Sequence, residues 1–340
     1  MTRNAQTEQQ HPPSSVADWG RLVVEAYERI RSSIKETPLE PASDLAPQTG
    51  FHLFFKREDL QQTGSFKLRG ATNKILSLTR DQAARGVIAA SNGNHGLGVA
   101  AAARQNRVAA EVYVSAHVST AKAGRIEQLG ARLQRVGTDP LEAEVAARKA
   151  AESAGKVFIS PYNDFEVMAG QGTIAVEALR QAPRIDAVFV AVGGGGLIGG
   201  IGAYLKWASP QTEIVGCWPE NSRVLYESIK AGRILDVPEQ PTLSESTAGG
   251  LEAGSVTLDV CKSVIDRSVL VSEEEILAAM RLVHHRKGWV MEGAAAVALS
   301  AFLREPGRYT RKNVAVIICG GNLSPEVRGR VFSEIPNPRL

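Results

Sequence analysis

The chain has 340 residues, which is too long for one small hydrophobic core and suggests about two domains. Its 39 basic and 36 acidic residues leave a net charge of +3, which gives no electrostatic reason to expect nucleic acid or a membrane surface as a partner. Cys217, Cys261 and Cys319 show neither metal-ligand spacing nor an even-numbered disulfide framework, so they indicate a reducing compartment. Because the N-terminus lacks an apolar signal segment and no stretch is long and apolar enough to span a membrane, we expect a cytoplasmic protein.

The first 14 residues are polar and contain proline, which predicts a disordered tail over 1–14. Helical spacing of apolar residues follows over Val16–Ile34, and strand and helix patterns then alternate. The predicted strands are His52–Phe55, Val87–Ala90, Ala110–Val114, Arg132–Val136, Val157–Ile159, Ala187–Val192, Glu213–Cys217, Ser268–Val271 and Val314–Cys319. The predicted helices between them include Leu97–Gln105, Ala121–Leu129, Pro140–Ser153, Gln171–Gln181, Leu197–Trp207, Glu273–Lys287 and Gly293–Leu303. This alternation predicts an α/β fold with parallel sheets that helices cover on both faces.

Ligands of such sheets gather at the carboxyl ends of the strands, where loops lead into helices. The run Gly193-Gly194-Gly195-Gly196 follows one predicted strand and leads into a helix that starts near Leu197. Consecutive glycines let the backbone approach a ligand closely, and free N–H groups at a helix start attract phosphate. The loop therefore predicts a phosphate-binding site.

The same loop also satisfies a dinucleotide fingerprint. Gly194, Gly196 and Gly199 have the spacing G-x-G-x-x-G, and Glu220 lies just past the next predicted strand, where a ribose-binding acid belongs. The loop alone therefore leaves two interpretations open: a nicotinamide-dependent oxidoreductase that binds a dinucleotide, or a protein that binds another phosphate-bearing ligand.

A second loop, Thr63–Gly70, carries Lys67 between glycines before a helix predicted to start near Ala71. The field of a helix N-terminus lowers the pKa of a nearby amine, which favours a neutral nucleophile. A solvated surface lysine is the usual alternative, and Lys67 taken alone leaves both open.

Two further loops carry residues suited to ligand binding. Ser91-Asn92-Gly93-Asn94-His95-Gly96 offers small residues and N–H groups at a helix start, which suit a substrate carboxylate, although a generic capping turn has similar residues. His95 could act as a base or as a structural group. Cys319 ends an apolar strand, where a thiol is either a small buried side chain or a neutral partner for a heteroaromatic nitrogen.

Taken in this order, the loops resemble the serine/threonine dehydratase family of fold-type II pyridoxal-phosphate enzymes. The resemblance runs from Thr37-Pro38-Leu39 to Cys319-Gly320-Gly321-Asn322. The motifs that carry it are Lys56-Arg57-Glu58, Gly64-Ser65-Phe66-Lys67-Leu68-Arg69-Gly70, Gly93-Asn94-His95-Gly96, Ala169-Gly170-Gln171-Gly172-Thr173, the four glycines and Glu292-Gly293-Ala294. Threonine dehydratases, serine racemases, hydroxyaspartate dehydratases and the hydroxyectoine-pathway dehydratases all look similar at these positions.

The resemblance implies a tryptophan synthase β-like fold: two open, twisted, mostly parallel sheets flanked by helices, with the cofactor in the cleft between domains. We expect a large cofactor-binding domain from 15–60 and 156–340, and a small mobile domain from 61–155. The family's usual assembly is a homodimer, with a monomer as the alternative.

The resemblance also assigns residues to pyridoxal 5′-phosphate and to an amino-acid substrate. The implied cofactor contacts are Phe66 beside the ring, Lys67 as the covalent attachment, Asn94 at the ring hydroxyl, Gly193, Gly194, Gly195, Gly196 and Leu197 at the phosphate, Cys319 at the pyridine nitrogen, and Gly250 and Glu292 along the pocket. The implied contacts of the substrate carboxylate are Ser91, Asn92, Gly93 and His95.

These roles predict a hydro-lyase of the ammonia-lyase type that removes water from a β-hydroxy-α-amino acid and releases a 2-oxo acid and ammonia. Threonine, serine or a bulkier analogue such as phenylserine is the expected substrate, and the cofactor phosphate is the expected proton donor to the leaving hydroxyl. A catalytically silent cofactor-binding protein is the non-enzymatic alternative. Because Asn92 stands where racemases of the family carry a serine, we expect little racemisation.

Two further expectations follow from positions where this chain differs from the family pattern and from the length of the chain. Trp218 and Val224 stand where many relatives carry acidic metal ligands, so we predict no metal at this site, although Glu220 leaves a nearby cation open. The chain stops soon after Cys319, which suggests that it lacks the regulatory domain of feedback-inhibited relatives and has a catabolic role.

Overall fold

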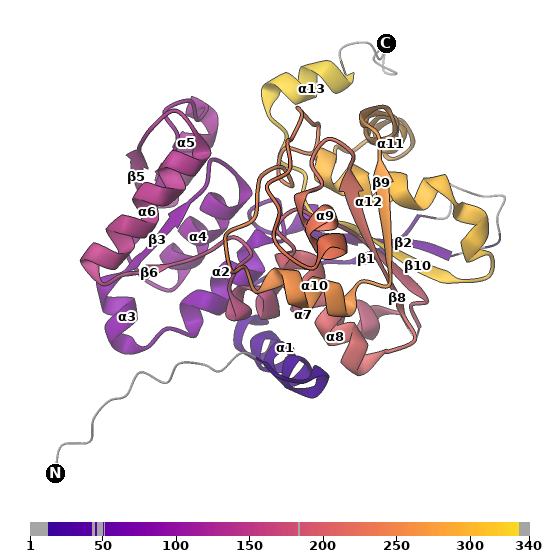
Figure 1. Cartoon of the computed structure of the whole chain (residues 1–340), viewed down its shortest axis with the longest axis horizontal. Coiled ribbons are helices and arrows are strands. Elements are labelled where there is room, and N and C mark those ends of the chain that lie inside the picture. The colour runs from indigo at the N-terminus through magenta and orange to yellow at the C-terminus, as the bar shows by residue number, and fades with distance from the viewer. Residues whose placement is uncertain (1–12, 43–44, 46–49, 51, 183, 333–340) are drawn as a thin grey trace.

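The computed structural model of the chain describes residues 13–42, 45, 50, 52–182 and 184–332. Apart from Pro13 and Ser14, the predicted disordered tail 1–14 lies outside the described residues. The architecture is mixed α/β with two sheets flanked by helices, which confirms the predicted fold class (Figure 1).

The larger sheet has six strands in the order β1-β2-β10-β7-β8-β9. Their bounds are β1 (Leu39–Pro41), β2 (His52–Arg57), β7 (Ala187–Ala191), β8 (Glu213–Pro219), β9 (Arg267–Val271) and β10 (Asn313–Ile318). Neighbouring strands run parallel except β1, which lies antiparallel to β2. Every residue of β7 is buried, as expected for a parallel strand with helices on both faces.

The smaller sheet has four parallel strands in the order β5-β4-β3-β6. Their bounds are β3 (Val87–Ala90), β4 (Ala110–Val114), β5 (Arg132–Arg135) and β6 (Val157–Phe158). Strand β6 pairs with β3 although it lies beyond the predicted end of the small domain at residue 155. The predicted division of the chain into domains stays a prediction.

Helices cover both sheets, and Figure 1 shows those of the smaller sheet in purple and magenta on the left. Those packed near the smaller sheet are α2 (Lys67–Leu76), α3 (Arg80–Arg85), α4 (Asn94–Gln105), α5 (Thr120–Gln128) and α6 (Pro140–Ala154). Those around the larger sheet are α1 (Val16–Ile30), α7 (Phe165–Gln181), α8 (Gly196–Ala208), α9 (Val224–Ala231), α10 (Thr257–Val264), α11 (Glu273–Lys287), α12 (Gly293–Arg304) and α13 (Pro325–Phe332). Short 3₁₀ turns span η2 (Glu58–Leu60) and η3 (Pro306–Tyr309).

Helix α2 joins the two halves of the molecule, since it packs against α4 on one side and α7 on the other. It begins at Lys67, four residues before the predicted start at Ala71. One tertiary contact accompanies the early start, because the N–H of Phe66 donates to the carbonyl of Cys319 at 3.0 Å, and a local bond from the N–H of Arg69 to the carbonyl of Phe66 closes the first turn. The chain is therefore fixed to β10 immediately before α2 begins.

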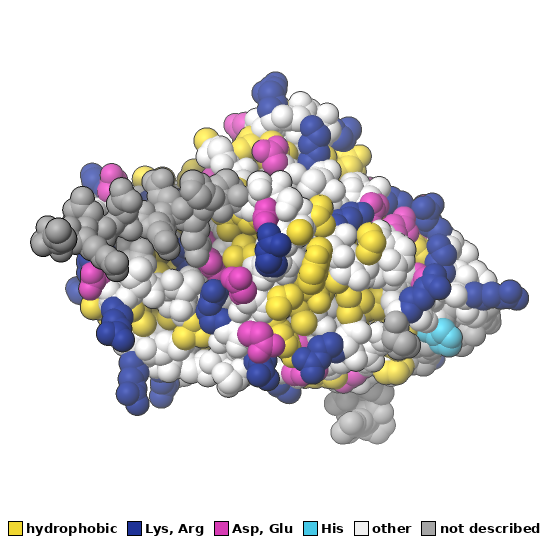
Figure 2. All heavy atoms as spheres, turned by 90° about the horizontal axis from the view of Figure 1, so that it is seen from below, with side chains coloured by type: hydrophobic (Ala, Val, Ile, Leu, Met, Phe, Trp, Pro, Cys, Tyr) yellow, Lys and Arg dark blue, Asp and Glu magenta, His cyan; other side chains and the backbone are white. Residues whose placement is uncertain are grey.

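The core divides between the two sheets. One cluster of buried apolar residues surrounds the larger sheet, and another surrounds the smaller sheet and includes Ile30, Leu68 and Val167 from α1, α2 and α7. None of the described helices is both long and apolar enough to cross a membrane. Figure 2, the view from below, shows basic and acidic side chains interspersed over that face.

Candidate active site

A cavity of about 830 Å³ lies where the carboxyl ends of strands from both sheets face each other. Residues after β3, β7 and β10 line it, together with the start of α2. The predicted site residues in its wall are Phe66, Lys67, Ser91, Asn92, Gly193, Gly194, Gly195, Gly196, Leu197, Gly250 and Cys319. The cavity thus gathers residues from loops that are far apart in the sequence, as parallel strand order requires.

Lys67 is the first residue of α2, and its side chain ends in the cavity. Its Nζ donates to the carbonyl oxygen of Pro161 at 2.8 Å and lies 5.1 Å from the centre of the Phe66 ring. Burial removes the ammonium from water and lowers the pKa of Lys67 from 10.5 to about 8, although Cys319 and Glu292 act in the opposite direction. Only a minor share of this amine is neutral at neutral pH, but that share is far larger than for an ordinary lysine, and the neutral form is the one that a nucleophile or base requires.

A buried group of charges holds α2 in place behind Lys67. Arg69 is fully buried and contacts Glu58 at 2.7 Å and Glu177 at 2.6 Å. Lys56, also fully buried, contacts Glu177 at 2.6 Å. Two cations and two carboxylates therefore balance, as buried charges must. This arrangement accounts for Lys56 and Glu58 of the Lys56-Arg57-Glu58 motif, which comes shortly before Lys67 in the sequence and anchors the helix that carries it.

The glycine run forms a tightly enclosed turn into α8. Gly195 is the N-cap of α8 and has φ of +87°, a left-handed conformation that favours glycine. A Cβ on Gly193 would lie 2.7 Å from the backbone oxygen of Thr247, and one on Gly194 would lie 2.5 Å from the Tyr162 ring. The loop therefore brings bare backbone to the cavity wall, with the N-terminus of α8 directed at the same region.

Cys319, Glu292 and Asn94 form a connected polar group at the base of the site. The thiol of Cys319 lies 3.7 Å from Glu292 Oε1, and the amide of Asn94 donates to Glu292 Oε2 at 2.9 Å. Asn322 in turn donates to Asn94 Oδ1 at 2.8 Å, and the hydroxyl of Ser246 donates to Glu292 at 2.9 Å. Glu292 and Asn94 are therefore brought beside Cys319, but neither forms part of the cavity wall.

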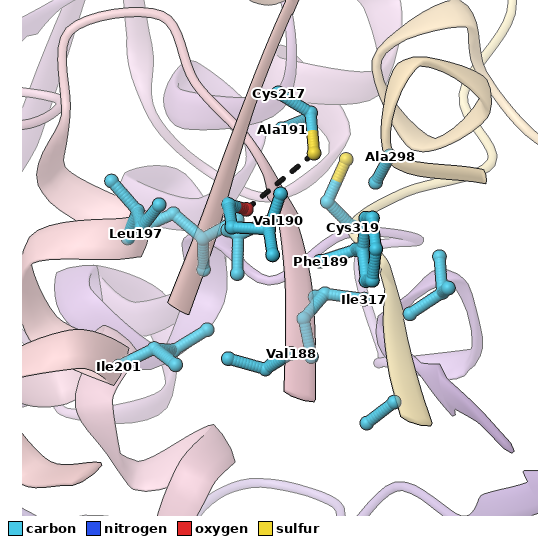
Figure 3. Close-up of a cluster of buried hydrophobic side chains, with 14 of the residues drawn as sticks. Val188, Phe189, Val190, Ala191, Leu197, Ile201, Cys217, Ala298, Ile317 and Cys319 are labelled. Carbon is cyan, nitrogen blue, oxygen red and sulfur yellow. Dashed lines mark hydrogen bonds between the residues drawn. The ribbon is translucent and has the colours of Figure 1, made fainter. Parts of the chain in front are cut away.

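Burial sets the charge state of this group. It raises the pKa of the Cys319 thiol well above its usual value, with the neighbouring Glu292 adding to the effect, so the thiol is neutral. Figure 3 shows Cys319, which directly follows β10, and Cys217, which lies within β8, in the buried apolar cluster of the larger sheet. Burial likewise raises the pKa of Glu292, which its hydrogen-bond donors partly offset.

The loop after β3 divides between the cavity and the interior. Ser91 and Asn92 line the cavity, whereas Gly93 and His95 do not. His95 is buried with Nε2 2.8 Å from the carbonyl oxygen of Ile159, and burial lowers its pKa to about 3. A neutral, internally bonded imidazole suits the structural alternative for this histidine better than a role as base.

Several residues of the site were not named as site residues from the sequence. Pro161 and Tyr162 line the cavity beside Lys67 and the glycine run, and Thr247 faces Gly193. The Thr247 loop contains Gly249 and Gly250, and Gly250 is one of the predicted pocket residues, so this loop did carry a signal, whereas the Tyr162 loop contains no glycine. Asn322 belongs to the Cys319-Gly320-Gly321-Asn322 motif, and its position shortly after β10 could have marked it as a site residue.

An aromatic side chain occupies the position at which the family resemblance implies a metal ligand. Trp218 on β8 is buried and packs against Tyr226 with ring centres 5.6 Å apart, and Val224 is buried at the start of α9. Glu220 is exposed. Within the described ranges, no group of three or more His, Cys, Asp or Glu side chains is arranged to hold a metal ion. The absence of a metal stays a prediction.

The donor set fits pyridoxal 5′-phosphate. The backbone cradle of Gly193–Gly196 and the start of α8 suit a phosphate, and the Lys67 amine suits covalent attachment to an aldehyde. The neutral Cys319 thiol suits a pyridine nitrogen. Lys67, Cys319 and the glycine run all line one cavity, so a single cofactor can reach all three.

Comparisons with known proteins agree with this fit. A family model described as pyridoxal-phosphate dependent enzyme matches residues 30–320. The L-threonine ammonia-lyase of Thermotoga maritima is 36% identical over 312 residues, which cover 92% of this chain and 77% of that protein. The serine racemase of Arabidopsis thaliana is 34% identical over 306 residues, covering 88% and 94%. The structure of the processed form of threonine deaminase isoform 2 from Solanum lycopersicum superimposes with a TM-score of 0.89 at 32% identity, covering 94% of each chain. The chain belongs to the pyridoxal-phosphate dependent enzyme family, within its serine/threonine dehydratase group, and pyridoxal 5′-phosphate is its cofactor.

Proposed function

We propose that this enzyme is a dehydratase that eliminates water from a β-hydroxy-α-amino acid and yields a 2-oxo acid and ammonia. The observation that carries the proposal is the Lys67 amine, which shares one cavity with the glycine run and with a neutral Cys319 thiol. Serine, threonine and phenylserine are the candidate substrates. The nicotinamide alternative has no support from the family match, which extends across both sheets.

The chain's own residues account for proton removal and substrate orientation. When bound, the cofactor withdraws electrons from Cα of the substrate. Lys67, with its pKa lowered to about 8, can hold or release a proton at Cα. Ser91 and Asn92 lie on the cavity wall next to the start of α4, where backbone N–H groups suit the substrate carboxylate.

Racemisation is the second candidate, because a serine racemase is among the relatives. It requires a second group that exchanges a proton on the other face of Cα. In this chain the amide of Asn92 is engaged with Ser115, donating to its hydroxyl at 2.8 Å and accepting from its N–H at 2.9 Å. A carboxamide held at both ends does not exchange protons, so we expect recovered substrate to keep its configuration, as chiral chromatography would measure.

Borohydride treatment tests the proposal. The purified protein should be yellow, and reduction should bleach it and fix the cofactor to the peptide that contains Lys67. Serine, threonine or phenylserine should release a 2-oxo acid, and a Lys67→Ala variant should lose this turnover. A yellow protein that releases no 2-oxo acid from any of them would support a silent relative instead. The cytoplasmic location, the homodimer and the catabolic role stay predictions.

A further inference from the structure

The mouth of the active-site cavity is rich in carboxylates. One side of the mouth is the start of α6, and the other is the loop 236–252 that precedes α10. The acidic residues of this wall are Asp139, Glu144, Asp236, Glu239, Glu245 and Glu252. Together they place a concentration of negative charge over the path that a substrate takes to Lys67.

Basic side chains are scarce in the same wall. Of the described residues that line the cavity, Lys67 alone has a basic side chain, and no arginine is among them. Lys67 is assigned to cofactor attachment and proton transfer at the base of the site, where its Nζ lies 2.8 Å from the carbonyl oxygen of Pro161. A second carboxylate on a substrate would therefore meet no free cation in the cavity.

Cations outside the wall compensate only part of the charge. Arg148 is shared between Glu144 at 2.8 Å and Glu252 at 2.6 Å, so this group keeps a net negative charge. Lys122 lies 3.7 Å from Glu245.

The other three carboxylates of the wall have no ion-pair partner among the residues that the structure describes. Asp139 accepts from the N–H of Leu141, and Glu239 accepts from the N–H of Gly249. Asp236 is exposed at the mouth. The mouth therefore carries uncompensated negative charge.

Apolar side chains lie between these carboxylates. Leu141 on α6 is 68% exposed, and Val237 and Leu251 stand in the opposite wall. They offer contact to an uncharged β-substituent, and the cavity volume of about 830 Å³ leaves room for one larger than methyl.

Building on the proposed function, we propose that this acidic wall selects β-hydroxy-α-amino acids whose side chain carries no negative charge. Substrates with a methyl or aryl β-substituent are accepted, and dicarboxylic ones such as 3-hydroxyaspartate are rejected. Asp236 is a specificity-determining residue in this selection. The rejection is electrostatic, because like charges repel at the mouth and no cation is present to replace the solvation that the second carboxylate loses.

The test compares kcat/KM of the holoenzyme for threonine, serine and phenylserine with kcat/KM for 3-hydroxyaspartate, and measures 3-hydroxyaspartate as an inhibitor of the neutral substrates. Two variants, Asp236→Asn and Asp236→Lys, change the charge at the mouth. Asp81→Lys is the matched control, since Asp81 is an exposed acidic residue on α3, before the amino end of β3 and away from the cavity wall.

Asp236→Lys should raise kcat/KM for 3-hydroxyaspartate relative to the neutral substrates by roughly fivefold, the size expected when the charge changes by two units about 8 Å away in water. If the wild type does not turn over 3-hydroxyaspartate, its inhibition constant should fall by a similar factor. Asp236→Asn should give a smaller change, Asp81→Lys none, and added salt should reduce the difference.

Equal kcat/KM of the wild type for 3-hydroxyaspartate and the neutral substrates would overturn this inference while leaving the dehydratase function intact. An unchanged preference in both Asp236 variants would overturn the role of Asp236. Failure of the wild type to release a 2-oxo acid from any of these substrates would instead refute the proposed function itself.

Discussion

Gly195→Ala is the substitution that most directly tests the phosphate cradle. Gly195 sits at the N-cap of α8 with φ of +87°. An added Cβ would lie 2.7 Å from Sγ of Cys261 and 2.8 Å from Cδ2 of Leu225, both of which are ends of side chains that can move. The substitution therefore combines backbone strain with crowding at the loop that we assign to the cofactor phosphate.

The expected cost follows from these two effects. An alanine in a left-handed conformation costs about 1–2 kcal/mol, and overpacking of a closed site costs about 1–3 kcal/mol more. If the loop relieves the strain by leaving its present conformation, the cradle is lost and the penalty falls on cofactor affinity. Since about 1.4 kcal/mol corresponds to a factor of ten, we expect the dissociation constant for pyridoxal 5′-phosphate to rise by at least about tenfold.

Titration of the cofactor-free protein with pyridoxal 5′-phosphate, followed by absorbance, measures this constant. Gly130→Ala is the control, because Gly130 has φ of +86°, has no atom within 4 Å of an added Cβ, and lies after α5 rather than in the cavity. It should lower stability through the same backbone strain without changing cofactor affinity. Wild-type affinity in Gly195→Ala, or an equal loss of affinity in both variants, would refute the assignment of the glycine run to the phosphate.

Two further predictions concern the charges around Lys67. Arg69→Met leaves Glu58 and Glu177 buried with one cation fewer, so urea unfolding should show a loss of about 3–5 kcal/mol; a loss below about 1 kcal/mol would contradict the anchoring role. In the cofactor-free protein, Lys67 releases its proton near pH 8 when folded but near pH 10.5 when unfolded. The unfolded state therefore binds more protons between these two pH values. The free energy of unfolding should consequently rise by about 3 kcal/mol as the pH is raised from 8 to 10.5. A Lys67→Met variant removes this contribution, and parallel pH profiles of the two proteins would contradict the lowered pKa.

Elements with strong end signals could be predicted from the sequence. The helix Glu273–Lys287 has the predicted bounds, because Ser272 forms a capping box with Glu275 and Gly288 ends the helix in a left-handed conformation. Short helices were missed, among them α3 and α9, because six to eight residues hold too little periodicity to distinguish them from loops. The antiparallel strand β1 was missed for the same reason, since it spans three residues.

The site shows a similar division. Loops that directly follow strands could be placed from the sequence, because parallel strands deliver their carboxyl ends to one edge, and Lys67, Gly193–Gly196 and Cys319 do line one cavity. Side-chain partners could not be placed. Asn94 bonds to Glu292, 198 residues away, and to Asn322, 228 residues away, and no periodic pattern encodes such pairings.

Contacts between the two halves of the molecule differ in strength between the rim and the base of the cavity. At the rim, Lys122–Glu245 and Arg148–Glu252 join helices of the smaller sheet to the loop before α10, and both pairs are partly exposed. Each such pair contributes about 0–1 kcal/mol, so separating them costs little. At the base, the amide of Asn94 donates to the buried Glu292. Breaking this bond would leave a buried carboxyl group without one of its donors, which costs more than separating the exposed pairs at the rim. We therefore expect the rim to open to admit substrate while the residues around Cys319 stay in place, so that the reaction can proceed in an enclosed site.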